Sequence, residues 1–109
     1  MEVELRLTDH YKPSDNKVLI GSEEGLRARK ELDLDNKDND GNNYTIIFDD
    51  NIRVVTLSFL YPMFKESHNG KTRKEMLSKY KLKYEGEVGH PQKVLENNYK
   101  EILEWIKGV

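Results

Sequence analysis

No cysteine occurs among the 109 residues of the chain. This absence excludes disulfide bonds, a catalytic thiolate, and zinc or iron–sulfur sites that depend on cysteine ligands. The chain also lacks an apolar segment at its N-terminus and any run of about 18 apolar residues, which argues against a signal peptide and a membrane-spanning helix. We therefore expect a soluble protein of the cytoplasm.

Hydrophobic residues are scarce, at 36% of the chain, and charged residues are almost as frequent, at 35%. This length and composition predict one domain, spanning residues 1–109, with a small core. The 20 acidic and 18 basic residues are interspersed and leave a net charge of −2. Because nucleic-acid-binding domains usually carry a basic excess on one face, we expect no nucleic-acid partner.

Motifs for common catalytic and cofactor sites are missing as well. The chain has neither of the usual glycine-rich phosphate-binding motifs and no Gly-x-Ser-x-Gly nucleophile motif. His10, His68 and His90 lie in predicted loops, and no pair has the spacing of a helical metal site, so we expect three ordinary surface histidines. We predict no catalytic residue, no metal, no cofactor and no enzymatic activity.

An acidic and amide-rich segment, residues 36–42, superposes on the start of an EF-hand calcium loop, with oxygen donors at positions 1, 3 and 5 and glycine at position 6. Position 12 is Ile47, where an EF-hand has a bidentate glutamate, and position 1 is Asn36 rather than aspartate. The residues that follow predict a strand instead of an exiting helix. We expect a solvated polar turn within the loop 33–43, in which loose cation binding stays open but an EF-hand is excluded.

Apolar residues concentrate between residues 44 and 64. Two runs rich in β-branched and aromatic residues predict strands buried on both faces, and an apolar segment that predicts a helix follows from Leu57. Alternation of apolar and charged residues from Val3 to Leu7 predicts a half-exposed edge strand. We predict an α/β fold with a single small mixed β-sheet of about four or five strands and packed helices. The other expected elements are strands at 18–20, 44–48, 52–56 and 81–84, and helices at 22–32, 72–80 and 91–107.

The ends of the helices give further expectations. Ser22 is expected to cap the helix at 22–32. Pro62 lacks an N–H group, so we expect it in the first turn of its helix, after an irregular entry around 59–61. Thr72 and Glu75 have the spacing of a capping box. Three side chains of the helix at 22–32 are expected in the core: Leu26, Ala28 and Leu32.

Two side chains are candidates for regulation or for contact with a partner. Ser58 lies between a strand and a helix, so its hydroxyl either caps the helix, or bonds a neighbouring turn, or accepts a phosphate that changes a partner surface. Trp105 lies off the apolar stripe of the last helix, on the flank shared with Glu101. It is either a partly exposed contact residue or packs over the sheet edge. The stripe itself consists of Val94, Leu95, Tyr99, Ile102, Leu103 and Ile106.

Short motifs in the chain resemble the STAS-like domains of unknown function found in bacteria and their mobile elements, which resemble in turn the STAS domains of anti-sigma factor antagonists. The motifs are a small-polar helix opening with an arginine at 21–27, a strand ending in an acid at 44–49, and Ser-Phe-Leu followed by Met-Phe at 58–64. About two-thirds of the chain takes part. The family often has two hydroxyls before the phenylalanine; here the first is Leu57, which leaves Ser58 as the matching position.

The resemblance implies a non-enzymatic regulatory protein that binds a partner, such as a kinase or an anti-sigma-like regulator. It implies Ser58 as the candidate phosphoacceptor and the segment 58–65 as the contact surface. The alternative is a phage or mobile-element inhibitor that binds and blocks a bacterial defence complex, as anti-CRISPR proteins do. A third alternative is a small hydrolase or calcium-binding module. The residues that we expect to contact a partner are Phe59, Tyr61, Met63, Lys65 and Trp105.

Overall fold

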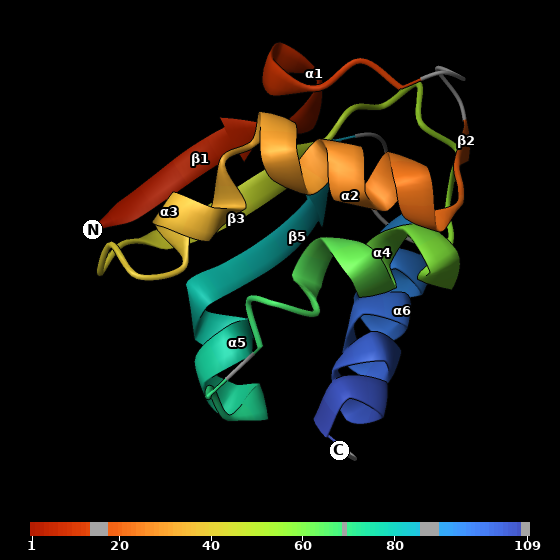
Figure 1. Ribbon diagram of the computed structural model, residues 1–109. Helices are drawn as coiled ribbons and strands as arrows, with labels where there is room; N and C mark the ends of the chain where they lie inside the picture. The colour runs from red at the N-terminus through yellow and green to blue at the C-terminus, as the bar shows by residue number, and fades with distance from the viewer. Residues whose placement is uncertain (14–17, 69, 86–89, 108–109) are drawn as a thin grey trace.

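The structure, a computed structural model, describes residues 1–13, 18–68, 70–85 and 90–107. Strands and helices follow one another along the chain, and the longer ones lie close to the positions that the apolar patterns predict (Figure 1). In chain order the described elements are β1 (Glu2–Arg6), α1 (Leu7–His10), β2 (Val18–Leu19), α2 (Ser22–Glu31), α3 (Leu34–Lys37), β3 (Asn43–Phe48), β4 (Val54–Val55), α4 (Leu57–Phe64), α5 (Arg73–Lys79), β5 (Tyr80–Tyr84) and α6 (His90–Lys107).

The main sheet has the order β1-β3-β5, and both of its pairings are parallel. In the central strand, Tyr44, Ile46 and Phe48 are buried, whereas Thr45 and Ile47 between them are partly exposed. This alternation is expected where successive side chains of a strand point to opposite faces and only one face lies against the core. The predicted edge strand at the N-terminus is β1, which ends at Arg6, one residue earlier than expected.

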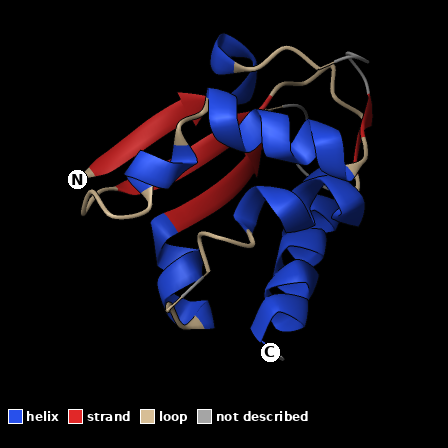
Figure 2. Ribbon diagram, viewed as in Figure 1, coloured by secondary structure: helices blue, strands red, loops and turns tan. Residues whose placement is uncertain are grey.

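The strand order also explains why the helices lie together. Parallel strands are joined by right-handed crossovers, so strands added successively in one direction place their connecting helices on one face of the sheet. The alternation in β5 agrees, because Tyr80 and Leu82 are buried and Lys81 and Lys83 are exposed. Figure 2 shows α2 crossing in front of the strands, with α4 next to it. The core therefore lies between this helical layer and one face of the sheet.

The predicted α/β class is confirmed, but the strands are arranged differently from the expected single mixed sheet. Within the described residues, β2 and β4 form a separate two-stranded sheet, and every strand pairing is parallel. Most of the predicted strand at 52–56 is not regular strand, since β4 includes only Val54 and Val55. Helix α4 follows the smaller sheet directly. The N–H of Thr56, the residue before α4, donates to the carbonyl of Leu19 in β2 at 3.0 Å.

Helix α2 begins as predicted, but the details of its first turn differ. Its N-cap is Gly21, whose φ of 94° is readily adopted only by glycine, so Ser22 is not the cap. Ala28 and Leu32 are buried as expected. Leu26 is 55% exposed, and its assignment to the core was wrong. The apolar face of α2 is thus narrower than the sequence suggested.

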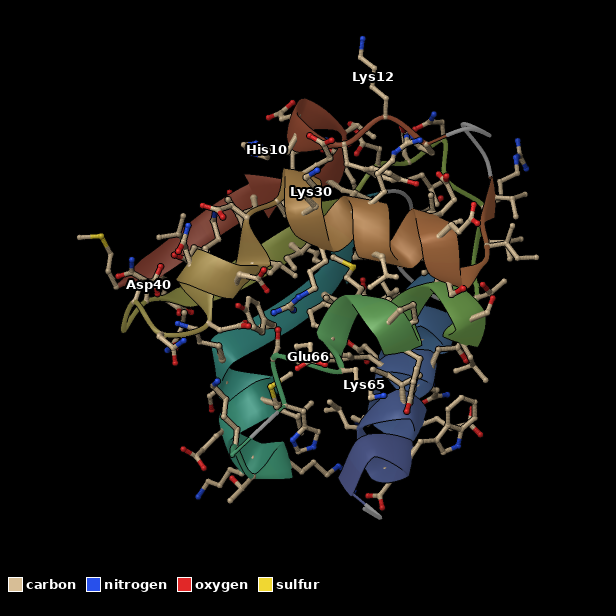
Figure 3. The ribbon with its side chains drawn as sticks, in the orientation of Figure 1. His10, Lys12, Lys30, Asp40, Lys65 and Glu66 are labelled. Atoms are coloured by element: carbon tan, nitrogen blue, oxygen red, sulfur yellow. The ribbon has the colours of Figure 1, made fainter. Side chains whose placement is uncertain are left out.

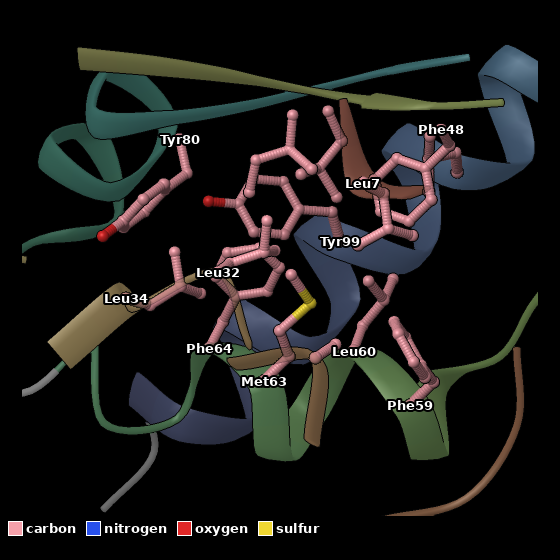
Figure 4. Packing of buried hydrophobic residues seen from close by; sticks show 14 of the residues in the cluster. Leu7, Leu32, Leu34, Phe48, Phe59, Leu60, Met63, Phe64, Tyr80 and Tyr99 are labelled. Atoms are coloured by element: carbon pink, nitrogen blue, oxygen red, sulfur yellow. The ribbon is translucent and has the colours of Figure 1, made fainter. Parts of the chain in front are cut away.

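Helix α4 begins at Leu57, two residues before the irregular entry expected around 59–61. Pro62 consequently lies inside the helix, in its second turn, rather than in the first turn. One face of α4 faces the sheet, and Figure 4 shows its side chains among the buried residues. These fully buried side chains are Phe59, Leu60, Met63 and Phe64.

Gly25 brings α2 and α4 into close contact. A Cβ atom at this position would lie 2.2 Å from the Phe59 carbonyl oxygen and 2.7 Å from Cγ of Pro62. A real side chain does not fit at these distances, so glycine is required for the two helices to approach as they do. Glycine lowers the intrinsic stability of a helix, but at position 25 it is required by the packing of α2 against α4.

The C-terminal third agrees closely with the sequence patterns. Thr72 and Glu75 form the predicted capping box at the start of α5. The Glu75 N–H donates to the Thr72 hydroxyl at 3.1 Å, and the Thr72 N–H donates to the Glu75 carboxylate at 3.0 Å. In α6 the predicted stripe is buried at Leu95, Tyr99, Ile102 and Leu103. Val94, at the edge of the stripe, is 39% exposed, and the side chain of Ile106 is outside the described part.

Candidate functional site

The outer side of α4 borders two apolar grooves. The first, which we call the α2–α4 groove, has a volume of about 690 Å³. Its walls come from Leu26 of α2, from Leu57, Tyr61 and Pro62 of α4, and from Trp105 of α6. Leu26 and Trp105 are each about half exposed, at 55% and 49%. Large apolar side chains from three helices thus converge on one concave surface.

The second groove, the β4–α6 groove, has a volume of about 560 Å³ and lies between the smaller sheet and the first turns of α6. Val54 of β4 and Val94 of α6 line it and are exposed. Leu57 and Ser58 line both grooves, so the two form one continuous surface around the start of α4. We call this continuous region the α4 surface.

The exposed apolar residues of the described chain concentrate on the α4 surface. Among the described residues, six large hydrophobic side chains are exposed. Four of the six line the two grooves: Leu26, Val54, Val94 and Trp105. Scattered exposed hydrophobic residues are ordinary, but a contiguous apolar patch on a soluble domain is typical of a binding surface. The α4 surface is therefore the candidate functional site.

An aromatic pair forms one end of this surface. The rings of Tyr61 and Trp105 are 6.0 Å apart and tilted by 51°, within the range of favourable aromatic packing. Nζ of Lys65 lies 5.7 Å from the centre of the Tyr61 ring, in a cation–π contact. Figure 3 shows Lys65 and Glu66 together, just past the end of α4. Both charged side chains are exposed, so the apolar surface has a polar rim at this end.

Ser58 lies where the two grooves meet, and its hydroxyl is hydrogen-bonded. Its Oγ accepts a bond of 3.0 Å from the Gly21 N–H and lies 2.9 Å from Oγ1 of Thr56. The Thr56 hydroxyl donates to the Leu19 carbonyl, so its proton is used and Ser58 is the donor in the bond between the two hydroxyls. Ser58 thus bonds the turn before α2, as one of the predicted alternatives has it, and does not cap α4.

The residues expected to contact a partner fall into two groups in the structure, one that lines a groove and one that is buried. Ser58, Tyr61, Lys65 and Trp105 line the same groove, although Trp105 is far from the others in the sequence. Phe59 and Met63 are fully buried and point toward the sheet, so they cannot reach a partner without unfolding of α4. We leave these two residues out of the candidate surface.

Several residues of the α4 surface were missed in the sequence. Leu26 and Val94 were assigned to the core because leucine and valine on an amphipathic helix usually face it. The spacing of residues in α2 could have indicated the exposure of Leu26, because Leu26 is four residues from the polar Ser22 and lies on the same side of the helix. The sequence indicates Pro62 only as a helix breaker, whereas Pro62 also forms part of the groove wall.

A buried polar cluster is the main alternative site. The guanidinium of Arg29 donates to Asp38 at 2.6 Å, to Ser67 at 2.7 Å and to the exposed Asp35 at 2.7 Å. Ser67 and Tyr80 donate to the other oxygen of Asp38 at 2.6 and 2.5 Å. Burial, together with the bond to Asp38, raises the pKa of Tyr80. Every member is bonded to another, which is how a structural buried ion pair is stabilised.

This cluster corrects the expectation of a solvated turn in the loop 33–43. Residues 34–37 of the loop form α3, and Asp38 is only 9% exposed because it pairs with Arg29. Asp40 is held by Lys79, whose Nζ lies 2.8 Å from Oδ1. Within the described residues, no group of histidine, aspartate and glutamate side chains could hold a metal ion.

The histidines are not all on the surface. His10 is exposed as expected, but His68 is only 5% exposed, so the prediction for it was wrong. Its Nε2 is buried and has no hydrogen-bond partner in the described part of the chain. The side chain of His90 is outside the described part. His10 and His68 do not belong to any group of described side chains that could hold a metal ion.

No protein-family model, curated protein or solved structure matches the chain. The resemblance to STAS-like domains therefore stays a prediction that rests on the short motifs in the sequence. Among the described helices, none is both long enough and apolar enough to span a membrane.

Proposed function

We propose that this protein is a non-enzymatic regulator that binds a partner protein through the α4 surface, with Ser58 as the switch. The observation that carries the proposal is the continuity of the two grooves around Leu57 and Ser58. Leaving four large apolar side chains exposed in one region costs hydrophobic free energy that a bound partner would recover. The STAS-like resemblance supports the same region, because its Ser-Phe-Leu motif begins at Ser58.

The composition of the surface favours a protein over a small ligand. Its two grooves share Leu57 and Ser58, and they extend over α2, α4, α6 and the smaller sheet. Binding energy at protein interfaces is concentrated in a few aromatic and apolar residues surrounded by a polar rim. Trp105 and Tyr61 would serve as such anchors, and Lys65 and Glu66 would belong to the rim.

A phosphate on Ser58 would act directly on this surface. It would place close to two negative charges at the point shared by both grooves, and an apolar partner could cover them only at a large desolvation cost. The phosphate would also replace the proton that Ser58 donates to Thr56. Helix α4 itself would tolerate the charge, because its first turn contains no acid and its N-terminus favours an anion. Phosphorylation would therefore reduce binding more than stability.

Affinity capture with the purified protein tests the surface. We expect a partner that is retained by the wild type and lost by Trp105→Asp and by Leu26→Asp, because each variant places a charge on the apolar surface. Lys30→Asp, a change at an exposed residue of α2 that lines neither groove, is the matched control and should retain the partner. A partner that binds both groove variants as well as the wild type would place the binding surface elsewhere.

The switch has its own test. Ser58→Ala should retain the partner, whereas Ser58→Asp should weaken binding at least about tenfold, since one buried charge exceeds the 1.4 kcal/mol that a factor of about ten requires. Incubation with a candidate partner kinase should then place phosphate on Ser58, located by mass spectrometry. If no phosphate is incorporated and Ser58→Asp binds normally, the switch is refuted while the binding surface still stands.

The identity of the captured protein decides between the two regulatory alternatives. A kinase or an anti-sigma-like regulator would support the STAS-like function. A nuclease complex of a bacterial defence system would support the inhibitor instead. In both cases the groove variants are expected to lose the partner, so capture is informative whichever protein is recovered.

A further inference from the structure

In the part of the chain that the structure describes, the main sheet has one uncovered face. The side chains that point away from the helices are exposed on β1 and β5 and partly exposed on β3. All-parallel sheets almost always have both faces covered, because their crossover helices usually occupy both sides. Here the sequential order β1-β3-β5 puts the helices on one side. The open face therefore lacks the layer that a parallel sheet normally has.

The charges on the open face are arranged in columns. The register aligns Glu4 with Thr45 and Lys81 in one row across the three strands. β1 contributes two acids and Arg6 to this face, β3 contributes uncharged residues, and β5 contributes lysines. In that order the three columns are Glu2, Glu4 and Arg6, then Asn43, Thr45 and Ile47, then Lys81 and Lys83.

The row of Glu4, Thr45 and Lys81 is complementary to the same row of a second copy in one orientation. A two-fold axis parallel to β3, between two stacked sheets, places β1 of one copy over β5 of the other and keeps each row at its own level. Glu4 of each copy then faces Lys81 of its partner, and the pair forms twice. An axis perpendicular to the strands through this row would instead place Glu4 over Glu4 and Lys81 over Lys81, which is unfavourable.

We propose that the open face of the sheet binds the open face of a second copy of this chain, with the two-fold axis parallel to β3. Thr45 and Ile47 lie on the central strand and would pack against their counterparts. Both are β-branched residues of the kind that interlock between stacked sheets. The α4 surface is on the helical side and stays accessible in this dimer, so the proposal does not rest on the proposed function.

The charges of the free protein are consistent with this assembly. Glu4 has no ion-pair or hydrogen-bond partner in the described part of the chain, so it is available to a second copy. Lys81 lies 3.2 Å from Glu2, and in the dimer it would lie between that acid and Glu4 of the other copy. Arg6 lies at the level of Lys83 and would face Lys83 of the other copy. It is already paired with Asp49 and Glu85, so it does not oppose that lysine as a free charge.

The size of the face sets the expected affinity. Three strands about 4.8 Å apart and five residues long span about 14 by 17 Å. This is well below the area of about 800 Å² per partner that stable complexes bury, so the dimer should be weak, with a Kd on the order of 100 µM. It should weaken further at high salt, because its specificity depends on exposed charges.

Sedimentation equilibrium up to about 1 mM protein tests the proposal. The wild type should dimerise, whereas Glu4→Lys and Lys81→Glu should each be monomeric, because each creates two like-charge pairs. An equimolar mixture of the two variants should dimerise again, because at positions 4 and 81 one chain then carries two lysines and the other two glutamates, so that opposite charges face each other in both pairs. Recovery of the dimer on mixing shows that both variants are folded. This recovery cannot arise from contacts within one chain.

A second pair of variants controls for net charge. Glu31→Lys and Lys93→Glu make the same charge changes on the helical side, and each alone should dimerise like the wild type. A wild type that is monomeric at about 1 mM would overturn the proposal. So would a dimer that Glu4→Lys and Lys81→Glu leave unchanged, because it would use another surface, and so would a mixture of those two variants that stays monomeric.

Discussion

Gly25 gives the sharpest test of how α2 and α4 fit together. In most helices, replacement of an interior glycine by alanine stabilises the protein by up to about 1 kcal/mol, because alanine restricts the unfolded chain and favours the helix. We expect Gly25→Ala to do the opposite. Its new methyl group would lie 2.2 Å from the Phe59 carbonyl oxygen, which is backbone and cannot rotate away.

The size of the effect follows from the distances. Ordinary van der Waals contact begins near 3.4 Å, so α2 and α4 would have to separate by about 1.2 Å. Over-packing of this kind costs about 1–3 kcal/mol, and the backbone contact favours the upper part of that range. After the helix-propensity gain is subtracted, we expect a net loss of about 1–2 kcal/mol. For a domain of this size the loss corresponds to a Tm lower by about 4–12 °C.

Thermal and urea denaturation followed by circular dichroism measure this loss. Lys30→Ala, an exposed change on the same helix, is the control and should remain within about 0.5 kcal/mol of the wild type. A Gly25→Ala/Pro62→Ala variant relieves the 2.7 Å contact with the proline ring but keeps the 2.2 Å contact, so it should be less stable than Pro62→Ala alone. If Gly25→Ala is as stable as the wild type or more so, the close approach of the two helices is refuted.

Two further predictions concern charged groups. Asp38→Ala would leave the buried Arg29 without its main partner and should cost about 3–5 kcal/mol in urea denaturation; a loss below about 1 kcal/mol would contradict the structural role of the cluster. Desolvation raises the pKa of Asp40, but hydrogen bonds from Lys79 and Tyr44 outweigh it and hold this pKa well below its ordinary value. A lowered carboxyl pKa stabilises the fold above the ordinary value, so Tm should fall as the pH drops through about 4 and below. Asp40→Asn should flatten that decline, and an unchanged slope would count against the pairing with Lys79.

Local signals in the sequence were sufficient to locate most of the longer helices and strands. The capping box at Thr72 and Glu75 depends only on neighbouring residues, and the structure contains it as predicted. The strand at 44–48 and the helix at 22–32 were identified from apolar periodicity and composition. These predictions are correct because short-range hydrogen bonds and the burial of one face determine such elements without reference to the rest of the chain.

The features that could not be predicted depend on distant partners. Asp38 lies in a segment rich in Asp and Asn that looks solvated, and it is buried only because Arg29 and Tyr80 meet it from other elements. Leu26 was assigned to the core because its helix position does not reveal how narrow the contact with α4 is. For the same reason the sequence placed Ser58 and Trp105 among the candidates but could not show that they line one groove.

The order of the strands has a consequence for how the chain can assemble during synthesis. β3 pairs with β1, which precedes it, and β5 then adds to the free edge of β3. In this sheet no later strand has to be inserted between two earlier ones. The first βαβ unit can therefore form as soon as residue 48 has left the ribosome, and each later segment can dock onto a surface that already exists. This vectorial growth shortens the time during which an unpaired hydrophobic strand is exposed to other chains.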